Sequence, residues 1–168
     1  MGNGVLIYYV TFSLLELLLR SLKKLCQLSP SKFNNLCCID SVLYQDRLQG
    51  GGDEVSAMVG DTNLFLQEDG VAEAEIMIAE VEARGGGLGR EAMLLMLRYG
   101  AETLKVKQFQ AKIKFSNTTS QNMFTKLGFK ESSRSEVFCE TTYICDVDKD
   151  FCDQLKQNTN WNIGKYMH

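Results

Sequence analysis

The chain has 168 residues and a formal net charge of −3, with 45% apolar and 23% charged residues. This balance fits one globular domain with its own core, and it excludes a disordered chain and a protein held on nucleic acid by bulk positive charge. The one histidine is His168, so histidine bases, triads that need histidine and histidine-rich metal sites are excluded, and no metal site is expected.

Residues 1–34 resist assignment. Val5 to Leu19 is an apolar run that is shorter than the roughly 18 residues of a membrane-spanning helix. We expect a packed helix that ends before Pro30, with a membrane anchor and a faulty or alternative gene model as the other interpretations. The six cysteines form no C-x-x-C pair and the start carries no secretion signal, which favours a cytoplasmic location, or a nuclear one.

From residue 34 onward, strand and helix patterns alternate. Strands are expected at 34–44, 58–66, 71–79, 107–115, 129–131 and 136–145, and helices at 88–104, 116–127 and 149–157. The turn at 67–70 joins two of these strands in an antiparallel hairpin. The predicted organisation is an atypical N-terminal segment at 1–34, expected to be helical, one α/β domain at 35–157 and a tail at 158–168.

A glycine turn, Arg84 to Gly89 (RGGGLG), connects the second hairpin strand with the long helix. Glycines let an anion approach the backbone, and the first N–H groups of a helix lack partners within the helix. Arg84 adds a positive charge. The turn therefore predicts an anion site, with a plain flexible turn as the alternative.

Two nucleotide motifs were tested against this turn. A P-loop is excluded, because no Gly-Lys-Ser/Thr follows it. The dinucleotide fingerprint G-x-G-x-x-A fits Gly87 to Ala92, but the next strand ends at Ser116 and Asn117 without the acid that would hold a ribose. A dinucleotide site is therefore disfavoured.

The turn resembles the pyrophosphate loop [QR]-x-x-G-x-[GA] of the GCN5-related N-acetyltransferases (GNAT). Residues Asn117 to Phe129 (NTTSQNMFTKLGF) resemble a second motif of that family, at the family's spacing. The similarity covers about residues 55–147. Within the family, the segments MVGDTNLFL and AEIMIAE are most similar to the eukaryotic N-acetyltransferase nine branch, which is described as acting on tubulin.

This resemblance implies an α/β fold whose mixed, mostly antiparallel sheet is splayed at an acetyl-CoA site, with an atypical or incomplete N-terminal part. Acetyl-CoA would enter between strands 71–79 and 107–115, and an N–H near Ala79 would polarise the thioester. The implied cofactor-binding residues are Ile78, Ala79, Arg84, Gly85, Gly86, Gly87, Leu88, Gly89, Asn117 and Phe124.

The implied reaction is acetyl transfer to a protein amine, with tubulin as a possible acceptor, by direct attack in a ternary complex. An ammonium group must lose a proton before it attacks, and a carboxylate is the natural base. Glu73 and Glu75 share one face of their strand. Glu73 is the first candidate, since its position matches the base of several relatives, and Glu75 is the second. The alternative is that both are solvent-facing strand residues.

Three departures from the family pattern favour a second hypothesis, a catalytically impaired acyl-CoA-binding or microtubule-associated module. Phe124 replaces the usual general-acid tyrosine, Gly86 and Val81 replace a long side chain and a proline, and residues 1–34 do not resemble the first strand and helices of the family. The lysines at 105, 107, 112 and 114 form a basic stripe. A solvated face is the favoured interpretation of this stripe, over contact with an acidic partner or a 3′-phosphate.

Overall fold

The computed structural model describes residues 6–8, 36–43 and 58–159, and in the first two segments it describes the backbone. The strands are β1 Leu6–Tyr8, β2 Leu36–Leu43, β3 Met58–Leu66, β4 Val71–Ile78, β5 Gln108–Lys114, β6 Lys130–Ser135 and β7 Glu140–Asp146. The helices are α4 Leu88–Glu102, α5 Thr118–Lys126 and α6 Lys149–Asn158, with 3-10 turns at Glu68–Gly70 and Val81–Ala83.

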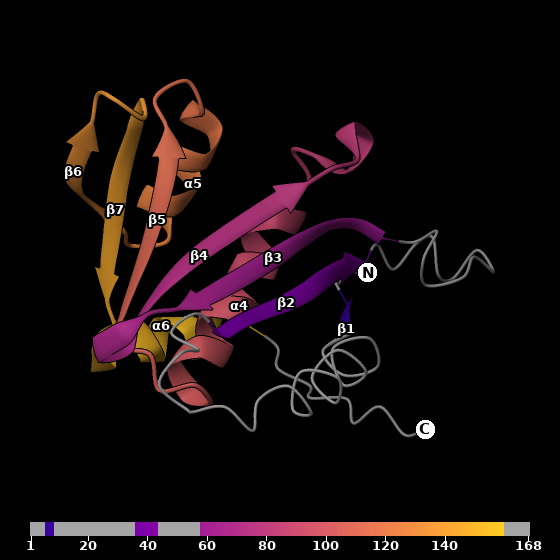
Figure 1. Ribbon diagram of the computed structural model, residues 1–168. Coiled ribbons are helices and arrows are strands. Elements are labelled where there is room, and N and C mark those ends of the chain that lie inside the picture. The colour runs from indigo at the N-terminus through magenta and orange to yellow at the C-terminus, as the bar shows by residue number, and fades with distance from the viewer. Residues whose placement is uncertain (1–5, 9–35, 44–57, 160–168) are drawn as a thin grey trace, which may run out of the picture.

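The strands form one sheet in the order β1-β2-β3-β4-β5-β7-β6. All neighbouring strands are antiparallel except β4 and β5, which are parallel. These two pair only from Val71 with Gln108 to Glu73 with Gln110, and beyond that point they diverge (Figure 1). The predicted α/β fold with a mixed, mostly antiparallel and splayed sheet is confirmed.

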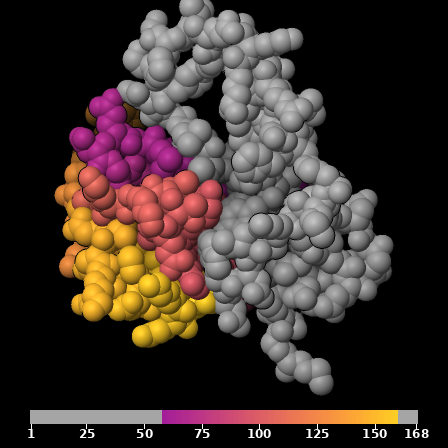
Figure 2. All heavy atoms as spheres, turned by 90° about the horizontal axis from the view of Figure 1, so that it is seen from below, coloured from indigo at the N-terminus to yellow at the C-terminus, as the bar shows by residue number. Residues whose placement is uncertain are grey.

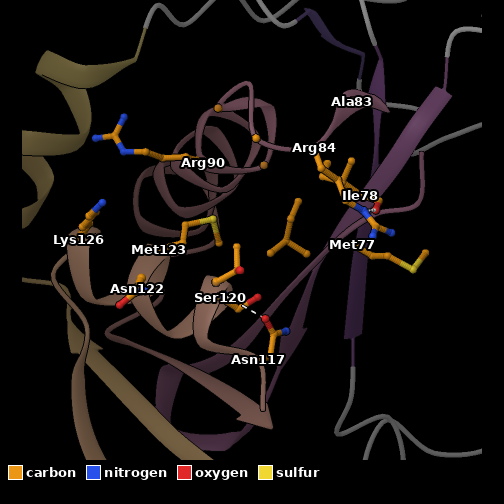
Figure 3. A pocket seen from close by; sticks show the side chains of 15 residues that line it. Met77, Ile78, Ala83, Arg84, Arg90, Asn117, Ser120, Asn122, Met123 and Lys126 are labelled. Carbon is orange, nitrogen blue, oxygen red and sulfur yellow. Dashed lines mark hydrogen bonds between the residues drawn. The ribbon is translucent and has the colours of Figure 1, made fainter. Parts of the chain in front are cut away.

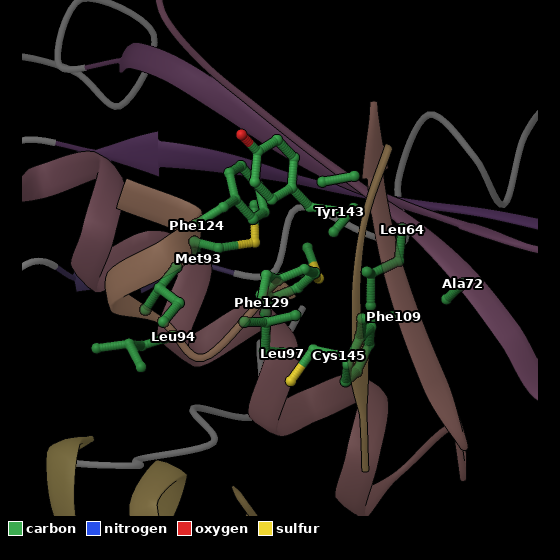
Figure 4. Close-up of a cluster of buried hydrophobic side chains, with 14 of the residues drawn as sticks. Leu64, Ala72, Met93, Leu94, Leu97, Phe109, Phe124, Phe129, Tyr143 and Cys145 are labelled. Atoms are coloured by element: carbon green, nitrogen blue, oxygen red, sulfur yellow. The ribbon is translucent and has the colours of Figure 1, made fainter. Parts of the chain in front are cut away.

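The helices α4, α5 and α6 share one core with a single face of the sheet. Phe109 of β5, Leu97 of α4 and Phe129 are fully or almost fully buried in this core (Figure 4). The small residues Ala72 and Ala74 of β4 let α4 lie close to the sheet. Seen from below, α6 lies beside α4 (Figure 2). This packing fixes the start of α4 near the diverging end of β4.

Most predicted elements are confirmed between residues 58 and 158, and two expectations need correction. Residues 136–139 form the turn between β6 and β7, so the strand predicted at 136–145 begins four residues later, at Glu140. Leu6–Tyr8, inside the segment expected to be helical, is a strand paired with β2, in keeping with the strand preference of β-branched and aromatic residues. The rest of that segment, at 9–35, lies outside the described residues.

Among the described residues, no helix is both long enough and apolar enough to cross a membrane.

Candidate active site

A cleft of about 780 Å³ opens between the diverging end of β4, the start of α4 and the outer face of α5 (Figure 3). Its volume is within the range of ~300–1,000 Å³ that is usual for small-molecule sites. The lining residues are Ile76, Met77, Ile78, Ala83, Arg84, Gly85, Gly87, Gly89, Arg90, Asn117, Thr119, Ser120, Asn122, Met123 and Lys126.

One wall of the cleft is the edge of β4 that faces away from β3. In an antiparallel pair, alternate residues direct their N–H and C=O groups to the partner strand. The Ala79 N–H donates to the Val59 carbonyl of β3 at 2.8 Å, and the Glu80 N–H donates to the same oxygen at 3.2 Å. By this alternation, Ile76 and Ile78 direct their backbone groups away from β3 and toward the gap.

This register changes the prediction for Ala79. Its N–H is already bound to Val59, and Ala79 does not line the cleft, so it is not a free donor for a thioester oxygen. Ile76 takes its place, together with the predicted Ile78, because these two residues present the edge that a strand-like ligand can pair with.

The start of α4 supplies the donors for an anion. Gly87 is the N-cap with a φ of +92°, a conformation that glycine adopts readily, and it has no side chain to cap the helix. The Glu91 N–H is bonded to the Gly87 carbonyl at 3.0 Å. The earlier N–H groups, those of Leu88, Gly89 and Arg90, have no preceding helical carbonyl, and with the helix dipole they favour a negative charge.

Arg84 spans the cleft wall beside this helix start. Its Nε donates to the Ile78 carbonyl at 2.8 Å, and a terminal nitrogen donates to the Ala79 carbonyl at 3.2 Å. The guanidinium is thereby held over the end of β4. In Figure 3 it lies beside Ile78, while the side chains of Arg90 and Lys126 lie on the opposite side of the cleft. Because the described residues of the lining include these three cations and no carboxylate, the cleft favours a polyanion.

The opposite wall is the first turns of α5. Asn117 is the N-cap of this helix, and its side-chain oxygen accepts from the Ser120 N–H at 3.1 Å. Asn117 lines the cleft, as predicted, but its oxygen is committed to the cap, which leaves its amide nitrogen for a ligand. Thr119, Met123 and Lys126 follow at helical spacing on the cleft side.

Phe124 occupies a different place from the one predicted. Its side chain is 2% exposed and packs edge to face on Phe129 with ring centroids 5.0 Å apart. It does not line the cleft, and Met123 stands in the wall where the resemblance implied Phe124. Phe124 therefore supports the site from the core.

The two candidate bases have different surroundings. Three side chains donate to Oε2 of Glu73: Lys112 at 2.6 Å, Gln67 at 3.2 Å and Gln110 at 3.5 Å. Glu75 is exposed and lies beyond the last residues that β4 pairs with β5. Met77, the next residue on the same strand face, lines the cleft. Partial burial, followed by the charges of Glu73 and Asp61, raises the pKa of Glu75.

The structure thus brings part of the predicted site together. Of the predicted cofactor residues, the cleft is lined by Ile78, Arg84, Gly85, Gly87, Gly89 and Asn117. Ala79, Gly86, Leu88 and Phe124 do not line it. On the α5 wall the prediction named Asn117 and Phe124. It missed Thr119, Asn122, Met123 and Lys126, although these recur at spacings of three and four and so mark one helix face.

Comparison with known families identifies residues 40–130 as an Acetyltransferase (GNAT) domain. This match covers more than half of the chain and includes β3, β4, the glycine turn, α4, β5 and α5.

Curated relatives carry related names. The chain is 46% identical over 121 residues to the alpha/beta-tubulin-N-acetyltransferase 9 of Drosophila melanogaster, covering 68% of this chain and 60% of the relative. It is 50% identical over 115 residues to an N-acetyltransferase 9-like protein of Nematostella vectensis, covering 67% of this chain and 58% of that protein. The human alpha/beta-tubulin-N-acetyltransferase 9 is 44% identical over 115 residues, covering 67% of this chain and 56% of the human protein. The chain therefore spans about 60% of the length of these relatives.

Solved structures support the fold. A domain from Methanocaldococcus jannaschii superposes with a TM-score of 0.60 at 22% identity, covering 87% of this chain and 100% of that one. A ribosomal-protein-S5-alanine acetyltransferase from Vibrio fischeri gives 0.57 at 13% identity, covering 79% and 69%.

Proposed function

The chain belongs to the GNAT family of acetyltransferase domains, and from that premise we propose that it transfers the acetyl group of acetyl-CoA to a protein amine. The observation that carries this proposal is the combination, in one cleft, of a strand edge at Ile76 and Ile78, beyond the pairing of β4 with β5, and an uncapped helix start rich in glycine. An extended amide-containing arm ending in phosphates matches both features. Acetyl-CoA has this chemistry.

In this proposal, the pyrophosphate binds the backbone N–H groups between Gly85 and Arg90, and Arg84 adds charge there. The pantetheine arm pairs with the edge of β4 at Ile76 and Ile78. Met123 packs against it from α5. The thioester end then lies near Glu75. Met77 borders the cleft, and Glu75 is its neighbour on the same face of β4.

We propose Glu75, rather than Glu73, as the general base. Glu73 is held by Lys112 and two glutamine side chains, whereas Glu75 lies beyond the last β4–β5 pair and has a pKa raised above its ordinary value, which makes it the better proton acceptor. An ammonium group gives its proton to the Glu75 carboxylate, and the amine nitrogen attacks the thioester carbonyl carbon. The new C–N bond forms and the C–S bond breaks. The sulfur leaves as a thiolate, the nitrogen loses its second proton as the amide forms, and the thiolate takes up that proton through solvent water. Glu75 then releases the first proton to solvent.

The acceptor we propose is a tubulin N-terminus, which makes a cytoplasmic location the natural one. Support comes from the names of two relatives that are 44% and 46% identical over about two thirds of this chain. Because the chain spans about 60% of their length, acceptor recognition is the part of the proposal that most needs a direct test.

The test is acetyl transfer from acetyl-CoA to peptides that copy the N-termini of α- and β-tubulin, with scrambled peptides as controls. Glu75→Gln should lower kcat by about 100-fold or more, in the range of general-base effects, and Glu73→Gln should lower it much less. Both variants should retain the acetyl-CoA affinity of the unaltered chain. Binding of acetyl-CoA without transfer to either peptide would support the binding-module alternative, and a larger effect of Glu73→Gln would move the base to Glu73.

A further inference from the structure

An ion pair lies at the point where β4 and β5 separate. Glu73 and Gln110 are the last residues that pair these strands. Lys112, two residues farther along β5, extends back to Glu73, and its Nζ lies 2.6 Å from Oε2. The Glu73 side chain is only 15% exposed and that of Lys112 is 45% exposed. The ion pair thus joins the two strands at the apex of the splay.

This arrangement makes the two carboxylates of the β4 face unequal. Oε2 of Glu73 also accepts hydrogen bonds from Gln67 and Gln110. Within the part of the chain that the structure describes, the carboxylate of Glu75 accepts no side-chain hydrogen bond. One carboxylate is therefore held across the strand gap by three donors, while the other, one step closer to the cleft, accepts no side-chain hydrogen bond from the described residues.

We propose that Lys112 is a positioning residue for the transfer reaction: it holds Glu73 across the apex of the splay and thereby leaves Glu75 as the carboxylate that receives the acceptor's proton. This inference rests on the proposed function. It also assigns a role to one member of the basic stripe that the sequence alone favours as a solvated face. Lys112 acts by holding Glu73 and by its own charge near Glu75, and it has no contact with the reacting atoms in this scheme.

The charges around Glu75 give the inference a measurable consequence. The described charged groups that act on Glu75 are Asp61 on β3, Glu73 on β4 and Lys112 on β5. The two carboxylates raise the pKa of Glu75, and Lys112 lowers it. Without Lys112 the charge of Glu73 is uncompensated, so the pKa of Glu75 rises. As the pH falls, Glu75 then becomes protonated, and can no longer act as a base, at a higher pH than in the unaltered chain.

Lys114 provides a matched control. It lies two residues farther along the same face of β5 and also forms an ion pair, with Glu140 at 3.1 Å, but this partner is on β7. Lys112→Met and Lys114→Met therefore each remove one lysine charge and one cross-strand ion pair. Only Lys112→Met acts at the β4–β5 apex. Lys112→Arg restores the charge, and Lys112→Gln is a milder second variant that retains a hydrogen-bond donor.

The experiment measures kcat/KM against pH with acetyl-CoA and the tubulin peptides, together with acetyl-CoA affinity by calorimetry. In Lys112→Met and Lys112→Gln, the acidic limb should move to higher pH by about half a unit to one unit. Lys112→Arg should restore it, Lys114→Met should match the unaltered chain, and acetyl-CoA affinity should be preserved.

A second readout does not depend on activity. Carbon-13 NMR of chains labelled at the glutamate carboxyl carbons, assigned with Glu75→Gln, should show Glu75 titrating at a higher pH in Lys112→Met than in the unaltered chain. If Lys112→Met and the unaltered chain both transfer acetyl groups with the same pH profile, the role of Lys112 is overturned and the proposed function stands. Failure of transfer by the unaltered chain would count against the proposed function, and the NMR titration would then decide whether Lys112 controls Glu75. An unchanged Glu75 titration in Lys112→Met would overturn the inference.

Discussion

Gly60 of β3 lies so close to Met77 of β4 that a Cβ atom on residue 60 would overlap the Met77 carbonyl oxygen. The same Cβ atom would stand 2.9 Å from the Cα of Ile78. The neighbouring residue Val59 accepts both the Ala79 and the Glu80 N–H groups on one carbonyl. A residue without a side chain is therefore required where β4 ends and the cleft begins.

Gly60→Ala should force β3 and β4 apart at this point. We expect a loss of roughly 1–3 kcal/mol in the free energy of unfolding, as for other overpacked sites, and weaker acetyl-CoA binding because the Ile76–Ile78 edge moves. Chemical denaturation and calorimetry measure the two effects. Gly86→Ala is the control for stability, since a Cβ there meets no described atom within 4 Å. Equal stability of the two variants would contradict the close approach.

The pair Met123 and Phe124 separates the cleft wall from the core. Phe124→Ala should lower the free energy of unfolding by about 3–5 kcal/mol, because a fully buried ring is removed. Met123→Ala should cost less stability and should weaken acetyl-CoA binding, since Met123 lines the cleft. Thermal denaturation and calorimetry on both variants test this division. A Met123→Ala chain with unchanged affinity would remove that residue from the proposed site.

Glu75 should make stability depend on pH with a definite sign. Its pKa is raised in the folded chain, so its contribution to stability is present below the unfolded pKa of about 4.3 and is lost as the pH rises through the folded pKa. The free energy of unfolding of Glu75→Gln, taken relative to that of the unaltered chain at the same pH, should therefore be higher at neutral pH than at about pH 4. Urea denaturation at several pH values measures this difference.

Glu131 supplies the opposite sign as a control. A hydrogen bond from Arg134, at 2.6 Å from its Nε, lowers the pKa of the Glu131 carboxyl. Its contribution is present above the unfolded pKa and is lost as the pH falls through the folded pKa. The free energy of unfolding of Glu131→Gln, relative to that of the unaltered chain, should thus be lower at neutral pH than at acid pH. The difference should be small because the pair is exposed. The same sign for both variants would contradict the surroundings described for Glu75.

The regular elements between residues 58 and 158 could be predicted because each has a strong local pattern. Apolar and β-prone composition marks β3, period-2 alternation marks β4, and helical periodicity marks α4. The turn at 136–139 was missed because Val137 and Phe138 are strand-forming residues and no glycine or proline marks the reversal. In the structure they are 86% and 65% exposed, and Cys139 has a positive φ of 53°. Pairing between β6 and β7, rather than local preference, sets that turn.

The sequence predicts the candidate site only at residues that belong to a recognisable motif. The glycine turn and Asn117 could be recognised from residue type and spacing. The free strand edge could not, since whether Ala79 or Ile76 faces the gap depends on the β3–β4 register and on the paired N–H groups at Val59. The difference between Glu73 and Glu75 likewise arises from Lys112, which is 39 residues away along the chain.

The central claim is that acetyl-CoA binds with its phosphates at the start of α4, and Gly89 tests it most directly. Gly89 lines the cleft in the first turn of α4, and a Cβ there makes ordinary contact with Ile78 at 3.5 Å. Gly89→Glu and Gly89→Gln are therefore matched in size and differ in charge. Calorimetry should show acetyl-CoA binding to the unaltered chain, and binding to Gly89→Glu weaker than to Gly89→Gln by about tenfold. No binding to the folded, unaltered chain, or equal affinity of the two variants, would contradict the account.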